Sequence, residues 1–321
     1  MKRFAKILGK LVLAVLIIFI VTGIFIYARG IPSYTAEIPE FKVTVTPESV
    51  ERGQKLVSML CAGCHMNSAT GKLTGTRMLD APSEFGEIYS QNITQDKTYG
   101  IGDWTDAELV YLLRTGIKRD GNYSPPYMAK LPGLADSDMN AIVSFLRSDN
   151  HMVNPDPMPD RPTKPSMLTK LLCHVAWKPF SYPTKPVELP NEKDSIAMGK
   201  YLANNLDCFS CHSADFKTND FQVPENSAGY FAGGNKPLNK KGEIMMTPNL
   251  TPDKETGIGN WSKEKFIKAL KTGVLDEEVP LRYPMTPYTQ LTDKEAGAIY
   301  AFLMTLEPVR HNVPRSGLTL K

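Results

Sequence analysis

The distribution of apolar and polar residues along the chain predicts a protein built from helices and loops. One uninterrupted apolar run covers residues 11–28, and later segments carry apolar residues at helical spacing, as in Ile142, Phe145 and Leu146. No segment shows the sustained alternation of apolar and polar residues that is typical of a strand. The pattern therefore predicts an all-α protein.

Start and stop signals delimit the expected helices. Thr46 is followed by a proline, which is typical of an N-cap with proline at the first helical position. Residues 105–108 and 292–295 both fit a capping box, and Gly116 and Gly273 are candidate helix stops. These signals predict helices over residues 46–60, 105–116, 136–147, 194–204, 262–273 and 292–306.

The N-terminal apolar run is long enough to cross a membrane. As a helix its 18 uncharged residues would extend about 27 Å. Four basic residues precede the run and one follows it closely, so the positive-inside rule keeps the N-terminus in the cytoplasm. A cleaved signal peptide is the alternative, but no A-x-A cleavage site follows the run. We expect a transmembrane signal-anchor over residues 1–30 and a linker over residues 31–45.

An internal repeat organises the rest of the chain. Asn92 and Trp104, which lie in the motifs N-I-T-x-D and G-I-G-x-W, recur as Asn249 and Trp261 at a constant spacing of 157 residues. A repeat this regular indicates two copies of one structural unit. We predict a first repeat, a proline-rich connector and a second repeat, over residues 46–150, 151–190 and 191–321.

Each repeat contains one C-x-x-C-H motif. The two copies consist of Cys61, Cys64 and His65, and of Cys208, Cys211 and His212. Cysteines three apart lie on one side of a helical turn, so both sulfurs can reach the two vinyl groups of one porphyrin, with the adjacent histidine as the proximal iron ligand. The motifs therefore predict two covalently attached haem c groups. A four-thiolate zinc site or a thiol redox pair is the alternative, but neither requires the histidine.

The repeat also indicates the sixth iron ligand. Of fourteen methionines, Met128 and Met285 coincide at the spacing of 157 residues, and both lie in proline-rich loops. The restricted backbone of such a loop would help to hold a weak thioether ligand against iron. We therefore expect His/Met ligation, which raises the redox potential and suits an electron carrier. The alternative is that both methionines only pack, beside an open or bis-histidine haem that uses His151, His174 or His311.

Together these motifs resemble those of dihaem cytochromes c related to the cytochrome c subunits of membrane-bound alcohol and gluconate dehydrogenases. The resemblance covers nearly everything from Thr46 onward. It implies a small all-α class I cytochrome c fold for each repeat, whose first and last helices would cross near Gly53 and Gly199. Such subunits often carry a third haem domain, whereas this chain has two motifs.

The resemblance also implies how the site residues are grouped. It places on one haem Cys61, Cys64, His65 and Met128, and on the other Cys208, Cys211, His212 and Met285. It further implies positions near the haem propionates for Asn92, Trp104, Asn249 and Trp261. Core packing is the alternative for these last four residues.

The connector is rich in proline, which predicts an extended and semi-rigid spacer. An apolar stretch at residues 167–177 interrupts it and predicts a short helix packed against one or both repeats. Within that stretch Cys173 and His174 resemble the end of a third motif, but Lys170 stands where the first cysteine would be. We therefore expect Cys173 to be buried and inert.

Charge and cofactor chemistry limit where the protein can be located and what it can bind. Residues 1–30 hold five of the 37 basic residues and none of the 34 acidic ones, which leaves the rest of the chain slightly acidic. Such a charge excludes the strongly basic domain that nucleic-acid binding requires. Haem c is attached outside the cytoplasm, so we expect a single-pass protein of the bacterial inner membrane with its haem domains in the periplasm.

These features predict an electron carrier without a substrate of its own. It would accept electrons from a quinol-oxidising complex or a dehydrogenase and pass them to an acceptor cytochrome or oxidase of a respiratory chain. Small, weak interfaces are typical of such redox encounters. The alternative is a dihaem redox enzyme. A peroxidase-like enzyme would need an open iron position, and a thiosulfate-oxidising enzyme would need a cysteine ligand, for which Cys173 is the candidate.

Overall fold

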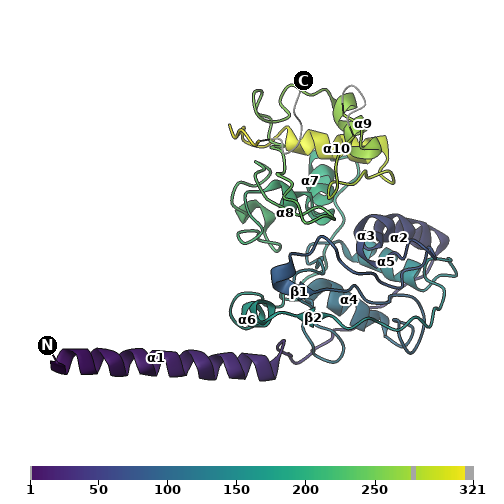
Figure 1. Ribbon diagram of the computed structural model, residues 1–321. Coiled ribbons are helices and arrows are strands. Elements are labelled where there is room, and N and C mark those ends of the chain that lie inside the picture. The colour runs from purple at the N-terminus through teal and green to yellow at the C-terminus, as the bar shows by residue number, and fades with distance from the viewer. Residues whose placement is uncertain (1, 276–279, 315–321) are drawn as a thin grey trace.

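The computed structural model describes residues 2–275 and 280–314, and this part of the chain is mostly helical (Figure 1). A long helix, α1 (Lys2–Arg29), projects from a body that contains the other helices. The remaining helices are α2 (Pro47–Leu60), α3 (Ala62–His65), η1 (Ser83–Phe85), α4 (Asp106–Thr115), α5 (Asp136–Leu146), α6 (Met167–Val175), α7 (Ser195–Asn205), α8 (Cys208–His212), η2 (Pro224–Asn226), α9 (Lys263–Thr272) and α10 (Asp293–Leu303). Two short strands, β1 (Gly86–Glu87) and β2 (Lys164–Pro165), pair antiparallel. Strands of two residues are too short to produce an alternating apolar and polar pattern in the sequence.

Most helix ends lie where the local signals predict them. The side chains of Thr46, Thr105 and Thr292 each accept a hydrogen bond from the backbone N–H three residues on, which completes a capping box in all three cases. Gly116 and Gly273 terminate α4 and α9 in the left-handed conformation that glycine adopts readily. The end of α10 differs from the prediction, because the helix stops at residue 303 rather than 306. The N–H groups of Thr305 and Leu306 donate to carbonyls three residues back, at 2.9 and 3.2 Å, so the chain tightens into a turn there and leaves the α-helix.

The helices of the two repeats correspond closely. α9 and α10 begin and end 157 residues after α4 and α5, which matches the spacing of the sequence motifs. In the first repeat α2 packs against α5, and in the second repeat α7 packs against α10. Both crossings occur at a glycine, as expected. A Cβ atom on Gly53 would overlap the carbonyl oxygen of Ala141, and one on Gly199 would overlap that of Ala298.

Charged and hydroxyl groups join the two repeats. Arg52 donates a hydrogen bond to Asp138 in its own repeat at 2.9 Å and another to Glu295 in the second repeat at 3.2 Å. The hydroxyl of Tyr201 donates to Asp138 at 2.7 Å from the opposite direction. Lys55 also forms an ion pair with Glu295. These partly buried contacts hold the repeats side by side, as Figure 1 shows.

The connector, which its prolines predict to be an extended and semi-rigid spacer, lies along the surface of the first repeat. Its backbone N–H groups donate to carbonyls of the first repeat, from Ser166 to Phe85 and from Phe180 to Thr115, both at 3.0 Å. Proline removes N–H groups and keeps the segment extended. Side chains supply further contacts, because the hydroxyls of Thr163 and Thr169 donate to the carbonyls of Tyr89 and Phe85 at 3.1 and 2.7 Å. The short helix expected at residues 167–177 is present as α6. It packs against η1 of the first repeat and against α1.

Cys173 lies on the inner face of α6. Its side chain is fully buried, as expected, and burial raises the pKa of its thiol to about 11. A thiol with a raised pKa is a poor nucleophile, so the inert role predicted for Cys173 agrees with its environment.

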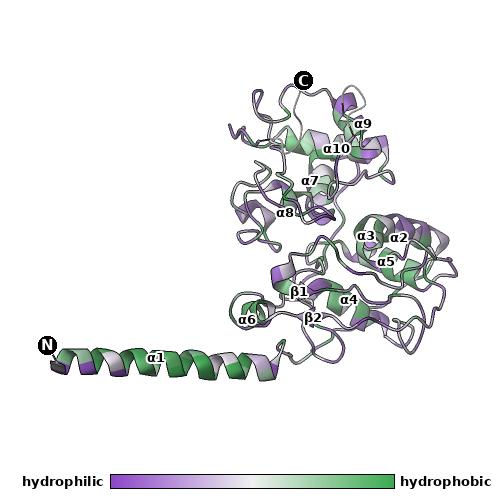
Figure 2. Cartoon of the chain, in the orientation of Figure 1, coloured by the Kyte–Doolittle hydropathy of each residue, from purple (hydrophilic) through white to green (hydrophobic). Residues whose placement is uncertain are grey.

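Helix α1 is apolar along most of its length (Figure 2). The segment of residues 3–29 is long and apolar enough to cross a membrane, and its most apolar 18 residues have a mean hydropathy of 3.0. Nearly all of its large side chains lie exposed, with Ile26 as the buried exception. By length and composition α1 therefore qualifies as a membrane span, although a signal sequence has the same properties.

Candidate functional site

The two C-x-x-C-H motifs lie in the short helices α3 and α8, each just after the first helix of its repeat. The four motif cysteines form no disulfide bonds. Burial raises the pKa of the Cys61, Cys208 and Cys211 thiols to about 12, so these groups are neutral at physiological pH. Redox-active and zinc-binding cysteines require the thiolate, which a lowered pKa favours. Among the described residues, no three His, Cys, Asp or Glu side chains are placed to hold one metal ion.

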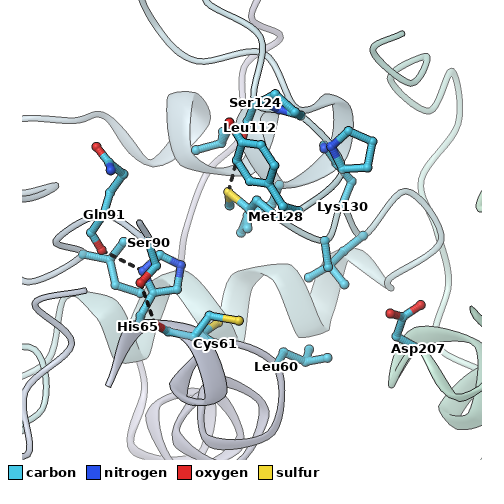
Figure 3. Close-up of a pocket in the computed structure, with 18 of the residues that line it drawn as sticks. Leu60, Cys61, His65, Ser90, Gln91, Leu112, Ser124, Met128, Lys130 and Asp207 are labelled. Atoms are coloured by element: carbon cyan, nitrogen blue, oxygen red, sulfur yellow. Dashed lines mark hydrogen bonds between the residues drawn. The ribbon is translucent and has the colours of Figure 1, made fainter. Parts of the chain in front are cut away.

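Each motif histidine is oriented by a hydrogen bond at its Nδ1 atom. Nδ1 of His65 lies 2.7 Å from the carbonyl oxygen of Gln91, and Nδ1 of His212 lies 3.0 Å from that of Pro248 (Figure 3 shows the first). Gln91 and Pro248 are again 157 residues apart. A carbonyl only accepts hydrogen bonds, so Nδ1 carries the proton and Nε2 keeps a free lone pair.

Burial also lowers the pKa of His65 and of His212, which keeps both imidazoles neutral. A neutral imidazole that donates its other N–H to a carbonyl is the usual state of a metal-ligating histidine. Both repeats therefore present a preformed nitrogen ligand directly after their cysteine pair.

A cavity of about 1530 Å³ lies over the motif of the first repeat. It exceeds the roughly 300–1,000 Å³ of ordinary small-molecule pockets, so it has room for a large cofactor. Cys61, Cys64, His65, Trp104 and Met128 are among the residues that line it. Figure 3 shows Met128 on the opposite side of the cavity from His65 and Cys61. The structure thus brings the predicted iron ligands of the first repeat to one space.

The methionine loops of the two repeats share one turn hydrogen bond. The N–H of Met128 donates to the carbonyl of Pro125 at 3.1 Å, and that of Met285 donates to the carbonyl of Arg282 at 3.0 Å. The hydroxyl of Ser124 also donates to the thioether sulfur of Met128 at 3.6 Å. These turns fix the position from which each thioether would reach an iron.

Lys130 is a cavity residue that the sequence did not reveal. Its side chain is only 7% exposed, and Nζ has no hydrogen-bond partner. The ammonium lies 5.1 Å from the centre of the Tyr123 ring, and burial lowers the pKa of Lys130 to about 7. A buried cation is unfavourable unless an anion compensates it, so this wall suits a ligand that carries carboxylates. The corresponding residue of the second repeat is Pro287, so comparison of the repeats could not have identified the lysine.

The second repeat contributes to the wall of the same cavity. Asp207, Phe209 and Tyr288 line it, and Figure 3 shows Asp207 at its edge. Asp207 directly precedes the second motif and has a positive φ of 62°, which is unusual for a residue with a side chain. Burial raises the pKa of its carboxyl group to about 7. The cavity of the first repeat therefore extends to the start of the second C-x-x-C-H motif.

The two predicted asparagines have structural roles. The side-chain oxygen of Asn92 accepts hydrogen bonds from the N–H and hydroxyl of Thr94, while its amide nitrogen donates to connector carbonyls. Asn249 makes the same two contacts with Thr251 and donates to the carbonyl of Val309. These bonds hold both amides in place, and Asn92 also lines the cavity of the first repeat. A position near a propionate stays a prediction for both asparagines.

The two tryptophans are both half-buried and carry a cation over one face. The guanidinium of Arg119 lies 5.2 Å from the Trp104 ring centre, and Nζ of Lys265 lies 4.8 Å from that of Trp261. Trp104 lines the cavity of the first repeat. A position near a propionate remains a prediction for both.

The site residues fit a c-type haem. Paired cysteines, a histidine with Nε2 free, a methionine across a large cavity and an unpaired buried ammonium match its vinyl groups, iron and carboxylates. Comparison with family models gives the deciding observation, because the cytochrome c model matches residues 50–149 and again residues 196–307. The chain belongs to the cytochrome c family. Membership implies covalently bound haem c.

Individual cytochromes c resemble the chain over most of its length. It is 30% identical over 236 residues to the fructose dehydrogenase cytochrome subunit of Gluconobacter japonicus, a match that covers 70% of this chain and 45% of that protein. It is 29% identical over 259 residues to the cytochrome c subunit of alcohol dehydrogenase (quinone) from Gluconacetobacter polyoxogenes, covering 78% of this chain and 54% of the other. The chain thus spans about half the length of these two relatives.

A third relative matches this chain over most of the length of both proteins. The diheme cytochrome c-type protein of Cereibacter sphaeroides is 28% identical over 295 residues, which cover 83% of this chain and 88% of that protein. The resemblance inferred from the motifs to cytochrome c subunits of dehydrogenases is therefore confirmed.

Proposed function

We propose that this cytochrome c is a membrane-anchored dihaem electron carrier that acts between a respiratory donor and an acceptor cytochrome or oxidase. The observation that carries the proposal is the matched pair of histidines, each with Nδ1 bonded to a carbonyl and Nε2 left free. The family model also matches twice, once around each motif. A histidine of the same geometry in each repeat favours a carrier with two redox centres.

Each repeat would form one haem domain. The residues that would hold the two groups are Cys61, Cys64, His65 and Met128 in the first, and Cys208, Cys211, His212 and Met285 in the second. A bound haem c supplies a one-electron couple at its iron. The chain contributes the fixed imidazole orientation, the proline-bounded methionine turns and a cavity with room for a large cofactor. The contacts among Arg52, Asp138 and Glu295 also fix the position of the two repeats, and so of their motifs, relative to each other.

The relatives indicate the class of donor. Two of those described above are named as cytochrome subunits of fructose and alcohol dehydrogenases. A dehydrogenase or a quinol-oxidising complex is therefore the proposed donor. Helix α1 would anchor the carrier in the bacterial inner membrane, with both haem domains in the periplasm.

Ligand binding separates a carrier from a dihaem enzyme. With methionine as the sixth ligand at both sites, we expect the native ferric protein to bind cyanide or imidazole slowly and weakly. Neither peroxide nor thiosulfate should be turned over. In membranes that contain the donor, addition of quinol or of the dehydrogenase substrate should reduce both haems, which their visible absorption would report. Rapid, tight binding of cyanide together with peroxide or thiosulfate turnover would contradict the proposal and favour the enzyme.

The buried ammonium of Lys130 gives a prediction about redox potential. Below its pKa of about 7 the Lys130 amine is positively charged, and a positive charge beside the cavity favours the reduced, less positive state of the site. Measured below pH 7, Lys130→Met should therefore lower the midpoint potential of one haem. We expect a decrease of tens of millivolts, on the order of the 59 mV that corresponds to a tenfold change for one electron. Potentiometric titration measures it, with Lys42→Met as the control because the Lys42 side chain is 84% exposed. Equal potentials in the two variants would show that the ammonium does not act on the haem.

A further inference from the structure

The short helix α6 has its apolar face turned outward. Met167, Leu168, Leu171 and Val175 form a stripe at helical spacing, and their exposed fractions lie between 38% and 65%. The opposite side of α6, with Thr169 and Cys173, is buried against the first repeat. On an ordinary surface helix the apolar stripe faces the core. An outward stripe indicates a surface that another apolar phase covers.

The C-terminal end of α1 lies directly beside α6. The rings of Phe25 and His174 are 6.2 Å apart, and Nε2 of His174 lies 3.1 Å from the carbonyl oxygen of Gly30. Nζ of Lys170 lies 4.7 Å from the centre of the Tyr27 ring. These contacts place α6 level with the last residues of the apolar run, where a spanning helix would leave the hydrocarbon.

The side chains around α6 are those typical of a membrane interface. Tyr27 and Trp177 are aromatic residues with a polar group, which concentrate at the boundary between lipid and water. Lys170 and Lys178 can extend along an apolar surface while they keep their charge in the headgroup region. Figure 1 shows α6 at the side of the body from which α1 projects, and it shows α6 end-on while α1 lies across the view.

We propose that α6 is an interfacial helix, whose apolar stripe inserts into the phospholipid surface of the same bilayer that α1 spans. The proposal rests on the proposed membrane anchor, and its continuity with α1 selects lipid over a protein partner as the occupant. The linker at residues 31–45 already ties α1 to the first repeat, because the N–H of Tyr34 donates to the carbonyl of Gly121 at 2.8 Å and that of Thr44 to the side chain of Asn140 at 2.7 Å. Insertion of α6 would add a second attachment to the bilayer and so hold the first repeat against the membrane in one orientation.

Quenching by lipids tests the placement in the full-length, haem-loaded protein. The variants Val175→Cys, Val45→Cys and Leu16→Cys are labelled with bimane and reconstituted into phosphatidylcholine vesicles, with or without a nitroxide on the lipid acyl chains. Val45 is a matched control, because it is 57% exposed, compared with 65% for Val175. It directly precedes the N-cap of α2, and Figure 1 shows α2 on the far side of the body from α1. The unsubstituted protein gives the background, since Cys173 is fully buried.

The ratio of fluorescence in the two kinds of vesicle cancels quenching by haem. We expect the labels at positions 16 and 175 to lose fluorescence in nitroxide vesicles and the label at position 45 to keep it. If position 16 is quenched while position 175 behaves like position 45, the anchor stands and α6 faces water or a protein. If position 16 is not quenched, the membrane anchor itself is wrong, and the inference falls with it.

Discussion

Replacing Gly53 or Gly199 with alanine is expected to destabilise the affected repeat by about 3 kcal/mol or more, or to prevent it from folding. At both helix crossings the added Cβ would overlap a backbone carbonyl oxygen, and a backbone atom cannot rotate away as a side chain can. The new methyl group would also lie 2.7 Å from Cβ of Phe145 in one case and 2.9 Å from Cβ of Phe302 in the other. The helices would have to separate, and the ligand-bearing α3 or α8 would move with them.

Gly297 provides the control for this effect. It lies within α10, and its added Cβ would meet the flexible end of the Lys263 side chain, which can move aside. Gly297→Ala should therefore be tolerated, with a small gain from the better helix propensity of alanine. Urea unfolding followed by circular dichroism compares the three variants. Unchanged midpoints for Gly53→Ala and Gly199→Ala would contradict the crossing geometry.

The second large effect is expected from Met128→Ala and Met285→Ala. Each variant should lose one sulfur-to-iron charge-transfer band in the near infrared and keep both covalent haems, because the cysteines and histidines are untouched. The midpoint potential of the affected haem should fall by on the order of a hundred millivolts, within the ≈ 0.8 V range that axial ligands span. Difference spectra and potentiometry would measure both changes.

Met158→Ala serves as the matched control. Met158 lies in the connector with 38% of its surface exposed, and its sulfur accepts only a long contact from Asn67. This variant should keep both bands and both potentials. If Met128→Ala or Met285→Ala leaves the band at full intensity, the ligand assignment from the repeat is wrong.

Local signals account for what the sequence could predict. Capping residues such as Thr105 and Thr292, helix stops such as Gly116, and the C-x-x-C-H motifs act over a few residues, so their positions can be read directly. The constant spacing of 157 residues extended this local reading to Met128 and Met285. The short helix in the connector and the burial of Cys173 also followed from its apolar pattern.

Features formed between distant segments could not be predicted in this way. The connector binds the first repeat largely through backbone groups of that repeat: the carboxylate of Asp160 accepts from the N–H of Asn92, and the hydroxyl of Thr163 donates to the carbonyl of Tyr89. Any residue supplies such a backbone partner, so the sequence does not indicate where the connector binds. The carbonyl partners of His65 and His212 are backbone atoms too, for which any residue suffices. Lys130 has no counterpart in the second repeat, and Asp207 enters the first cavity only because the repeats pack together.

The number of haems per chain tests the account most directly. A pyridine haemochrome assay and intact mass of the exported full-length protein should give two haems per chain. The count should be one in Cys61→Ala/Cys64→Ala, one in Cys208→Ala/Cys211→Ala, and two in Cys173→Ala. A full-length protein that carries one haem or none, when expressed with haem attachment machinery, would contradict the dihaem carrier.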